Sequence, residues 1–374
     1  MRVESFKEKL HQFPKTLISI MVMLSCIGFL MLYDAAGGSI YPYASKQMTY
    51  FALFIPVMFF IGFSNIKVFF HGAYYVYALS LLLLIAVSIV GHTAMGATRW
   101  INFGIFKFQP SELMKIGIVF ALAKYFHTTE YTDIKRVPFL LVPAMMVGVP
   151  LLIILKQPDL GTAIVLCMVS VIILYLAGVR LYLFGLGALV AGGTIPILWQ
   201  YLHEYQKKRI LVFLDPEQDK LGAGYNIMQS KIAIGSGGFW GKGRLEGSQA
   251  QLEFLPEHQT DFVFSLFAEE FGFIGCFALL FLFAVAIIKG ARIGINCKNT
   301  FGKLLSFGLI SIFSIHVFIN IGMVIGVLPV VGLPLPFVSY GGTSMVTMLI
   351  AFGLLINVAL NDKTNLPNNE LGIF

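Results

Sequence analysis

Long apolar runs alternate with short polar segments along the whole chain. Each run has about 20 residues, enough for a helix to cross about 30 Å of hydrocarbon. The runs are continuously apolar rather than alternating, which favours helices over strands. We therefore predict an all-α polytopic membrane protein, a bundle of ten transmembrane helices. The predicted spans are about 16–34, 48–65, 72–91, 111–127, 137–155, 160–178, 182–202, 261–288, 302–328 and 342–360.

The distribution of lysine and arginine predicts the orientation of the bundle. With the N-terminus inside, fourteen basic residues fall in cytoplasmic segments, whereas four fall in short external loops. Cytoplasmic loops carry such an excess, so both termini are predicted to be cytoplasmic. The apolar run at 16–34 is too long for a cleaved signal peptide and reads as the first span. One long extracytoplasmic loop, about 203–260, separates spans 7 and 8.

Composition supports this interpretation and narrows the function. The chain is 57% hydrophobic and 12% charged, against about 25% charged residues in soluble domains. Soluble, disordered and fibrous classes are thereby excluded, and residues 1–374 are read as one integral membrane domain. The net charge of +7 reflects the cytoplasmic loops, so no nucleic-acid partner is implied. The four cysteines are read as packing residues.

Polar chemistry gathers in four segments that span parity places on the external side. The first holds Arg99 and leads into span 4, where Ser111 is predicted to cap the helix. Glu112 suits the first turn, and Lys115 lies on the same face three residues later. Either Glu112 caps the helix while Lys115 extends to the membrane interface, or the pair marks a substrate path, because intramembrane charges usually face a cavity.

The second and third segments are a tight turn and the long loop. Asp159 lies in the turn between spans 5 and 6, where it serves either turn chemistry or a site. The long loop contains Arg209 and a glycine-rich stretch with Lys242 and Arg244. That stretch does not match the sequence motif of a nucleotide-binding phosphate loop. Its backbone amides and cations either approach an anionic headgroup such as a pyrophosphate, or belong to a flexible surface loop.

The fourth segment, 328–343, is uncharged, apolar and helix-breaking, and such backbone needs protein or a cavity to satisfy it. Asp261 stands at the start of span 8, where it is either an N-cap or a reactive carboxylate. Glu269 and Glu270 lie two turns further along and require partners. His316 is predicted to make a buried polar contact in span 9. The seven histidines show no metal-binding spacing.

Several motifs follow one another along nearly the whole chain: GATRW at 96–100, QPSE at 109–112, QPDLGT at 157–162, GYNIMQS at 224–230, LPEHQTDF at 255–262 and PLPFVSYGG at 334–342. Together they resemble the SEDS family (shape, elongation, division and sporulation). Three features are more similar to the elongation branch of the family than to its division branch. They are the turn at 156–161, the stretch at 241–249 and the short N-terminus.

This resemblance implies a peptidoglycan glycosyltransferase that polymerises lipid II into glycan strands at the outer face of the bacterial cytoplasmic membrane during elongation. It implies Asp261 as the catalytic residue, the general base for attack of the acceptor hydroxyl. It also implies a charged pair in span 4 and polar cavity positions, which here are Glu112, Lys115, Arg99, Asp159 and Arg209. Lys242 and Arg244 are added as candidate pyrophosphate contacts. Gln259 departs from the histidine or arginine common in relatives.

The same resemblance implies partners and a cofactor. The partners are lipid II, the nascent strand, a class B penicillin-binding protein and other elongation-complex membrane proteins. A divalent cation, Mg²⁺ or Mn²⁺, is the cofactor to consider. Two alternatives stay open: a lipid II flippase, and a scaffold that only holds the transpeptidase. A flippase should show inverted repeats or a polar cytoplasmic vestibule, and neither is readable in the sequence.

Overall fold

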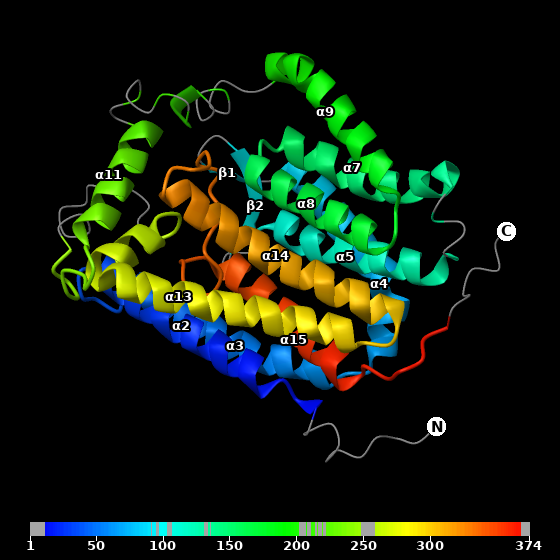
Figure 1. Cartoon of the computed structure of the whole chain (residues 1–374), viewed down its shortest axis with the longest axis horizontal. Helices are drawn as coiled ribbons and strands as arrows, with labels where there is room; N and C mark the ends of the chain where they lie inside the picture. Colours follow the sequence, from blue (N-terminus) through cyan, green and yellow to red (C-terminus); the bar gives the residue numbers. More distant parts are fainter. Residues whose placement is uncertain are drawn as a thin grey trace.

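The computed structural model describes residues 12–90, 92–94, 97–102, 107–130, 134, 136–201, 207, 211–213, 215, 219, 222–247 and 259–367. Within them, each of the ten predicted runs is helical (Figure 1). The helices are α2 (Lys15–Ala35), α3 (Tyr43–Phe63), α4 (Ile66–Val90), α5 (Pro110–Thr128), α7 (Leu141–Lys156), α8 (Leu160–Leu176), α9 (Leu181–Tyr201), α13 (Val263–Asn296), α14 (Thr300–Val324) and α15 (Gly342–Leu360). A short 3₁₀ turn, η1 (Val137–Leu140), precedes α7.

Seven of the helices in the described part are long and apolar enough to cross a membrane: α2, α3, α4, the helix ending at Lys156, α13, α14 and α15. α8 is shorter, with 17 residues, and α5 carries three charged residues along its length. Large apolar side chains on the outer helices are exposed, as a surface facing lipid requires. The chain is a multi-pass membrane protein.

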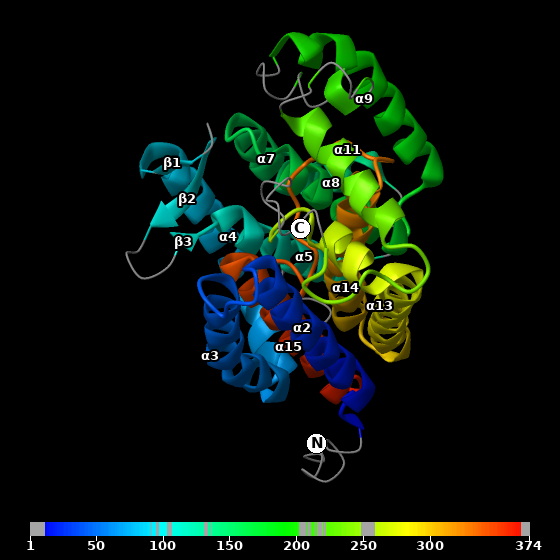
Figure 2. The same cartoon turned by 90° about the vertical axis from the view of Figure 1, so that its left-hand side faces the viewer.

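The helices run side by side, with α2 and α3 on one flank and α7, α8 and α9 on the other (Figures 1 and 2). α5, α14 and α15 form the centre of the bundle, and most of their side chains are buried. Buried amides tie helices together: Asn357 Nδ2 in α15 donates to the carbonyl of Ser64, just past the end of α3, at 2.6 Å. α2 begins and α15 ends at the same end of the bundle (Figure 1).

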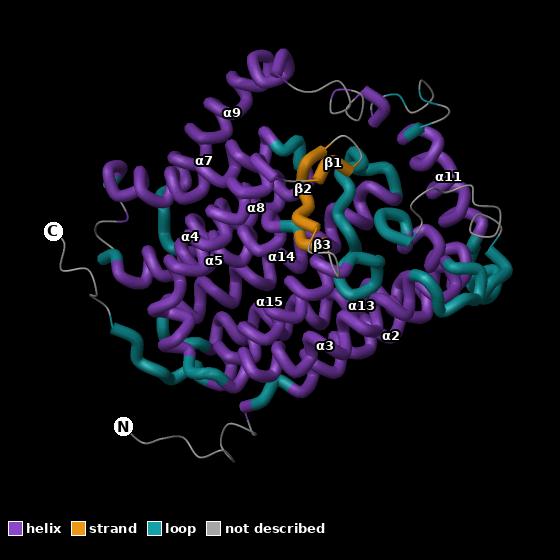
Figure 3. Tube along the Cα trace, turned by 180° about the vertical axis from the view of Figure 1, so that it is seen from behind, coloured by secondary structure: helices purple, strands orange, loops and turns teal. Residues whose placement is uncertain are grey.

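A small sheet departs from the purely helical prediction. Strands β1 (His92–Ala94), β2 (Ala97–Asn102) and β3 (Lys107–Phe108) pair antiparallel in that order. They connect α4 to α5, outside the apolar runs, and are small beside the helical mass (Figure 3). β-branched and aromatic residues such as Thr98, Trp100 and Ile101 favour strands, which explains the hairpin.

The long loop between α9 and α13 contains a helix, α11 (Ala223–Ser236), beside α13 and α14. Ser230 Oγ in α11 donates to the Val324 carbonyl at 2.7 Å. The segment after α11, residues 237–244, which we call the glycine turn, folds against α13 at Gly272, where the helix is kinked with φ +62°.

The glycine turn replaces the hydrogen bonds that the kink breaks. In an unbroken helix the amides of residues 273 and 274 would donate to the carbonyls of residues 269 and 270. Each of these four groups instead bonds to the turn. The bonds are Phe273 N to Gly238 O (3.0 Å), Ile274 N to Phe239 O (3.2 Å), Lys242 N to Glu269 O (3.0 Å) and Gly243 N to Glu270 O (3.1 Å). The kink is therefore built into the fold and holds Lys242 and Arg244 beside α13.

We expect Gly272→Ala to destabilise the protein by about 1–3 kcal/mol, because this backbone conformation is essentially restricted to glycine. A Cβ there would also clash with the backbone of Gly241. Gly148→Ala in α7 is the matched control, since a Cβ there meets nothing within 4 Å and alanine favours a helix interior. Unfolding midpoints in one detergent compare the two. Equal midpoints would contradict the proposed role of the kink.

The helix-breaking segment between α14 and α15 is satisfied by protein, as predicted. The Tyr340 amide donates to the Gln259 carbonyl at 2.8 Å, and Leu335 N donates to Ser339 Oγ at 2.9 Å. Gln47 in α3 donates through Nε2 to the Ser339 carbonyl at 3.1 Å and accepts from Gly341 N at 3.3 Å. These bonds fix the segment beside the start of α13. We call residues 328–341 the wall segment.

Candidate functional site

The site is built around the first turn of α5. The helix begins at Pro110 and its N-cap is Gln109 without a side-chain bond, so the prediction that Ser111 caps it is wrong. Proline is well suited to the first helical position because it lacks an amide donor, and this moves the start one residue earlier. Glu112 lies in the first turn as predicted. Ser111, Glu112 and Lys115 all face the protein interior and are buried.

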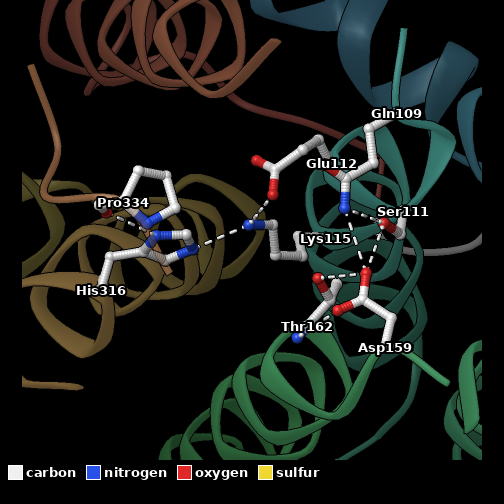
Figure 4. Close-up of polar contacts among 8 residues, drawn as sticks. All are labelled: Gln109, Ser111, Glu112, Lys115, Asp159, Thr162, His316 and Pro334. Carbon is white, nitrogen blue, oxygen red and sulfur yellow. Dashed lines mark hydrogen bonds and ion pairs between the residues drawn. The ribbon is translucent and has the colours of Figure 1, made fainter. Parts of the chain in front are cut away.

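A chain of polar contacts crosses the bundle from α5 to α14 (Figure 4). Lys115 Nζ donates to Glu112 Oε1 at 2.7 Å and to His316 Nε2 at 2.7 Å. An ammonium group only donates, so His316 Nε2 accepts, and its Nδ1–H faces the Pro334 carbonyl at 3.4 Å. Lys115 and His316 are 0% exposed. The predicted pair is therefore an interior ion pair rather than a snorkelling lysine.

Asp159 joins the starts of α5 and α8 (Figure 4). It is the N-cap of α8 and accepts from the Thr162 amide at 3.3 Å. Its Oδ2 accepts from Gln109 Nε2 (3.1 Å), Ser111 Oγ (3.3 Å) and Thr162 Oγ1 (2.9 Å). Asp159 is 4% exposed. These contacts assign the carboxylate to holding two helix termini in register beside the ion pair.

Asp261 precedes α13, which begins at Val263 with Phe262 as its N-cap. Asp261 is therefore not the cap of that helix, and the interpretation as a simple N-cap is wrong. Its backbone carbonyl accepts from Asn320 Nδ2 at 3.1 Å, and the same amide donates to the Leu333 carbonyl at 2.8 Å. The side chain is half-buried. Asn320 thus fixes Asp261 against the wall segment.

Close backbone approaches bring these parts together. A Cβ on Gly332 would lie 3.4 Å from Asp261 Oδ2, so the carboxylate lies against this turn, where φ is +73°. A Cβ on Gly161 at the start of α8 would lie 2.8 Å from the Val331 carbonyl. Residues 331–334 therefore contact Asp261, the α8 terminus beside Asp159, and His316 of the ion-pair chain. Glu112, Lys115, Asp159 and Asp261 are thus gathered around residues 331–334 of the wall segment.

Two buried acceptors in this site have unused capacity. Glu112 Oε2 and Asn320 Oδ1 have no hydrogen-bond partner among the described residues. A buried acceptor left unpaired costs about 1–3 kcal/mol, so native structures retain few of them. Glu112 belongs to the ion pair with Lys115, and the Asn320 side chain binds the Asp261 carbonyl.

The Tyr340 phenol lies beside the start of α3. Its ring meets Tyr43 edge to face, with 5.4 Å between centroids. Burial raises the pKa of Tyr340, and the nearby Tyr50 and Tyr43 raise it further. The phenol therefore stays protonated and serves as a hydrogen-bond donor throughout the neutral range.

Lys242 and Arg244 belong to a second cluster, beside the kink in α13. Lys242 Nζ pairs with Glu269 Oε1 at 2.6 Å. Arg244 donates two hydrogen bonds to Asp34 at the end of α2, from Nε to Oδ2 at 3.1 Å and from Nη2 to Oδ1 at 2.8 Å. Hydrogen bonding to Asp34 raises the pKa of Arg244. Glu269 thus has the partner that its membrane position demanded.

One interpretation of the glycine-rich stretch needs correction. Its backbone amides were considered as donors to an anionic headgroup, yet those of Lys242 and Gly243 are engaged by the carbonyls of α13. The reason is the kink, which leaves two carbonyls that need new donors. The cationic side chains remain candidate headgroup contacts, whereas these two amides do not.

Two predicted cations are not tested by the structure. Arg99 lies in β2, but its side chain is outside the described part, and Arg209 lies outside the described residues altogether. Among the residues described, no group of three His, Cys, Asp or Glu side chains is placed to hold a metal ion. The described residues therefore contain no such group for Mg²⁺ or Mn²⁺.

Sequence reasoning missed Asn320, Gln47 and Asp34. Asp34 and Asn320 are polar residues within predicted apolar runs and Gln47 directly precedes one, which is the signal that would have identified them. Their partners lie far away in sequence: Asp34 pairs with a residue 210 positions later, and Gln47 bonds residues 292 and 294 positions later. Such pairings follow from helix packing and not from local spacing.

Comparisons with known proteins agree with this architecture. The cell cycle protein family that comprises FtsW, RodA and SpoVE matches residues 15–364. The chain is 39% identical over 362 residues to the peptidoglycan glycosyltransferase MrdB of Escherichia coli, covering 96% of each protein. It is 36% identical over 358 residues to stage V sporulation protein E of Bacillus subtilis, covering 92% of this chain and 96% of that protein.

Solved structures show the same fold. A chain from a study of how a peptidoglycan synthase complex coordinates polymerization and crosslinking superposes with a TM-score of 0.82 at 31% identity, covering 94% of this chain and 99% of that one. The rod shape determining protein RodA of Thermus thermophilus superposes with a TM-score of 0.70 at 28% identity, covering 93% and 97%. By sequence and by structure, the chain belongs to the SEDS family of cell cycle proteins, and within it to the RodA type.

Proposed function

We propose that this protein is a peptidoglycan glycosyltransferase that polymerises lipid II into glycan strands during cell elongation. Relatives that match over almost their whole length are peptidoglycan glycosyltransferases. The observation that carries the proposal is local: Asp261, the Glu112–Lys115–His316 chain and the Asp159 cluster meet around residues 331–334. Charged groups gathered inside a membrane bundle are costly and usually serve a substrate.

The chemistry assigned to Asp261 is general-base catalysis. The 4-hydroxyl of an acceptor GlcNAc attacks the anomeric carbon of a lipid-linked MurNAc, and undecaprenyl pyrophosphate leaves. The Asp261 carboxylate removes the hydroxyl proton as the new bond forms. One displacement inverts the anomeric configuration, so no second carboxylate is needed as a nucleophile. Because Asp261 is half-buried and not used as a helix cap, it is suited to this task.

The surrounding groups orient the sugars. Glu112 Oε2 and Asn320 Oδ1 are acceptors placed to receive sugar hydroxyl or amide donors. Lys115 holds Glu112 in one rotamer and is itself held by His316. Preorganised polar groups in a site of low dielectric stabilise developing charge at little reorganisation cost. Asp159 supports this arrangement by fixing the termini of α5 and α8.

A requirement for Mg²⁺ or Mn²⁺ stays a proposal drawn from the family resemblance, and no step above depends on it. When bound, such an ion would offset charge on the leaving pyrophosphate. We expect EDTA to slow polymerisation by the purified protein and added Mg²⁺ or Mn²⁺ to restore it. Initial rates with and without chelator measure this. A rate that EDTA leaves unchanged would show that the reaction needs no divalent cation.

We further propose the finer topology: ten spans, both termini in the cytoplasm, and the site at the outer face of the bacterial cytoplasmic membrane. The excess of lysine and arginine in the opposite segments supports this orientation. Under this arrangement Asp159, Asp261 and the glycine turn all lie on the outer side of the bundle. A partner that supplies crosslinking, a class B penicillin-binding protein, fits the related peptidoglycan synthase complex, in which polymerization and crosslinking are coordinated. Other membrane proteins of the elongation machinery would join it.

Two other functions are tested in one experiment. A lipid II flippase would use the same buried charges to move a headgroup across the bilayer. A scaffold would neither translocate nor polymerise lipid II. Proteoliposomes that contain fluorescent lipid II separate the three. We expect glycan chains to grow, while translocation without chain growth would support a flippase, and neither event would support a scaffold.

A further inference from the structure

A groove of about 440 Å³ lies between α2 and α3, at the end of the bundle where the glycine turn lies (Figure 1). Its walls are apolar except at one end. The residues that line it from the two helices are Cys26, Phe29, Leu30, Tyr33, Ala44 and Met48. Both helices are candidate membrane spans. The groove therefore opens towards the lipid phase rather than towards the buried ion pair.

The lining of the groove is apolar along α2 and includes one cation, Arg244. Cys26 and Tyr33 both line it and are seven residues apart on α2, which is about 10 Å along a helix. Arg244 lines the groove as well, on the Asp34 side near the helix end. The volume falls within the usual range of small-molecule sites, about 300–1,000 Å³.

Arg244 can bind an anion without leaving Asp34. Its two bonds to Asp34 use two of the five N–H groups that a guanidinium carries. The side chain is 45% exposed, while that of Asp34 is fully buried. Asp34 and the glycine turn thus fix one edge of the guanidinium, and the other edge faces outward. A fixed guanidinium of this kind is the preferred partner of phosphate groups.

We propose that this groove binds the polyprenyl chain of a lipid-linked pyrophosphate, with the pyrophosphate on the outer edge of Arg244. The inference rests on the proposed function, because the polymerisation reaction uses such a carrier and releases it. Apolar walls match the chain, and the cation at the polar end matches the headgroup.

Two native cysteines provide the test. Cys26 lines the groove and is exposed, and Cys167 is exposed on α8. Alkylation of both by N-ethylmaleimide is followed by peptide mass spectrometry on the full-length protein in detergent. Undecaprenyl pyrophosphate should slow alkylation of Cys26 and leave that of Cys167 unchanged. Equal slowing of both, or of neither, would overturn the proposal.

Three further probes establish what the groove recognises. Undecaprenol has the chain without the charge, pyrophosphate has the charge without the chain, and phosphatidylglycerol is an anionic lipid with two chains. Each should protect Cys26 less well than undecaprenyl pyrophosphate at equal concentration. Equal protection by phosphatidylglycerol would overturn the assignment in favour of a general lipid site.

The charge of Arg244 is tested without leaving the Asp34 carboxylate buried and unpaired. The double variant Asp34→Asn, Arg244→Gln removes both charges and keeps both shapes. Its half-protecting concentration should rise about tenfold, the loss of one charge-assisted hydrogen bond. Asp34→Asn alone retains the cation and should protect Cys26 at least as well as the wild type. An unchanged half-protecting concentration in the double variant would contradict the role of Arg244.

The proposal and the proposed function fail separately. The Asp261→Asn variant should show normal protection of Cys26, because the groove does not include Asp261. Lipid II polymerisation by a protein in which undecaprenyl pyrophosphate never protects Cys26 would refute the groove alone. Protection of Cys26 in a protein that polymerises nothing would refute the enzyme and leave a lipid-binding site.

Discussion

Asp261→Asn is expected to lower the rate of lipid II polymerisation by about 10²–10⁴-fold, the usual contribution of a positioned general base. Asparagine keeps the shape of the side chain and removes its ability to take a proton. The hydrogen bond from Asn320 is accepted by the backbone carbonyl of Asp261 and remains. Folding should therefore be unaffected. Initial rates of lipid II consumption by the purified variant measure the effect.

The matched control removes a carboxylate elsewhere. Glu130 is exposed just beyond α5, where it takes no part in the polar contacts around residues 331–334. Glu130→Gln should retain the wild-type rate. A rate near wild type in Asp261→Asn would remove Asp261 as the base and leave the site without a defined proton acceptor.

Lys115→Met is expected to destabilise the protein by about 3–5 kcal/mol, because it leaves the Glu112 carboxylate buried without its cation. Lys115 is 0% exposed and Glu112 3% exposed, so neither group can turn to water. His316 also loses its donor. The unfolding midpoint in detergent measures the loss. Lys156→Met, at an exposed position in the last turn of α7, should leave the midpoint almost unchanged.

A double variant separates stability from function at the same pair. Glu112→Gln with Lys115→Met removes both charges and should recover most of the lost stability, since no buried charge is left alone. Polymerisation should remain impaired, because the Glu112 carboxylate no longer presents its free oxygen to the substrate. Recovery of both stability and activity would show that the pair only supports the fold.

The helices were predictable because a bilayer imposes a simple rule along the sequence: each apolar run must satisfy its own backbone. Helix ends were less predictable. α13 continues to Asn296, beyond the predicted 288, because helical hydrogen bonding does not stop where hydrocarbon ends. α14 ends at Val324, before the predicted 328, where Gly326 takes φ +76° and the next amides return to the Gly322 carbonyl.

The candidate site was predictable where family motifs named its residues, as for Glu112, Lys115 and Asp261. What those residues contact was not. The pairing of Asp34 with Arg244 joins helix α2 to a turn 210 residues later, and no local spacing encodes such a contact. The exchange of hydrogen bonds between the glycine turn and α13 depends on a kink at Gly272 that an uninterrupted apolar run conceals.

The most direct test of this account is the product that the purified wild-type protein forms from labelled lipid II in the absence of any other glycosyltransferase. We predict a ladder of glycan strands on a gel, formed with inversion at the anomeric carbon and absent from Asp261→Asn. A wild-type protein that folds and binds lipid II but yields no ladder, or an Asp261→Asn ladder of equal intensity, would contradict the account.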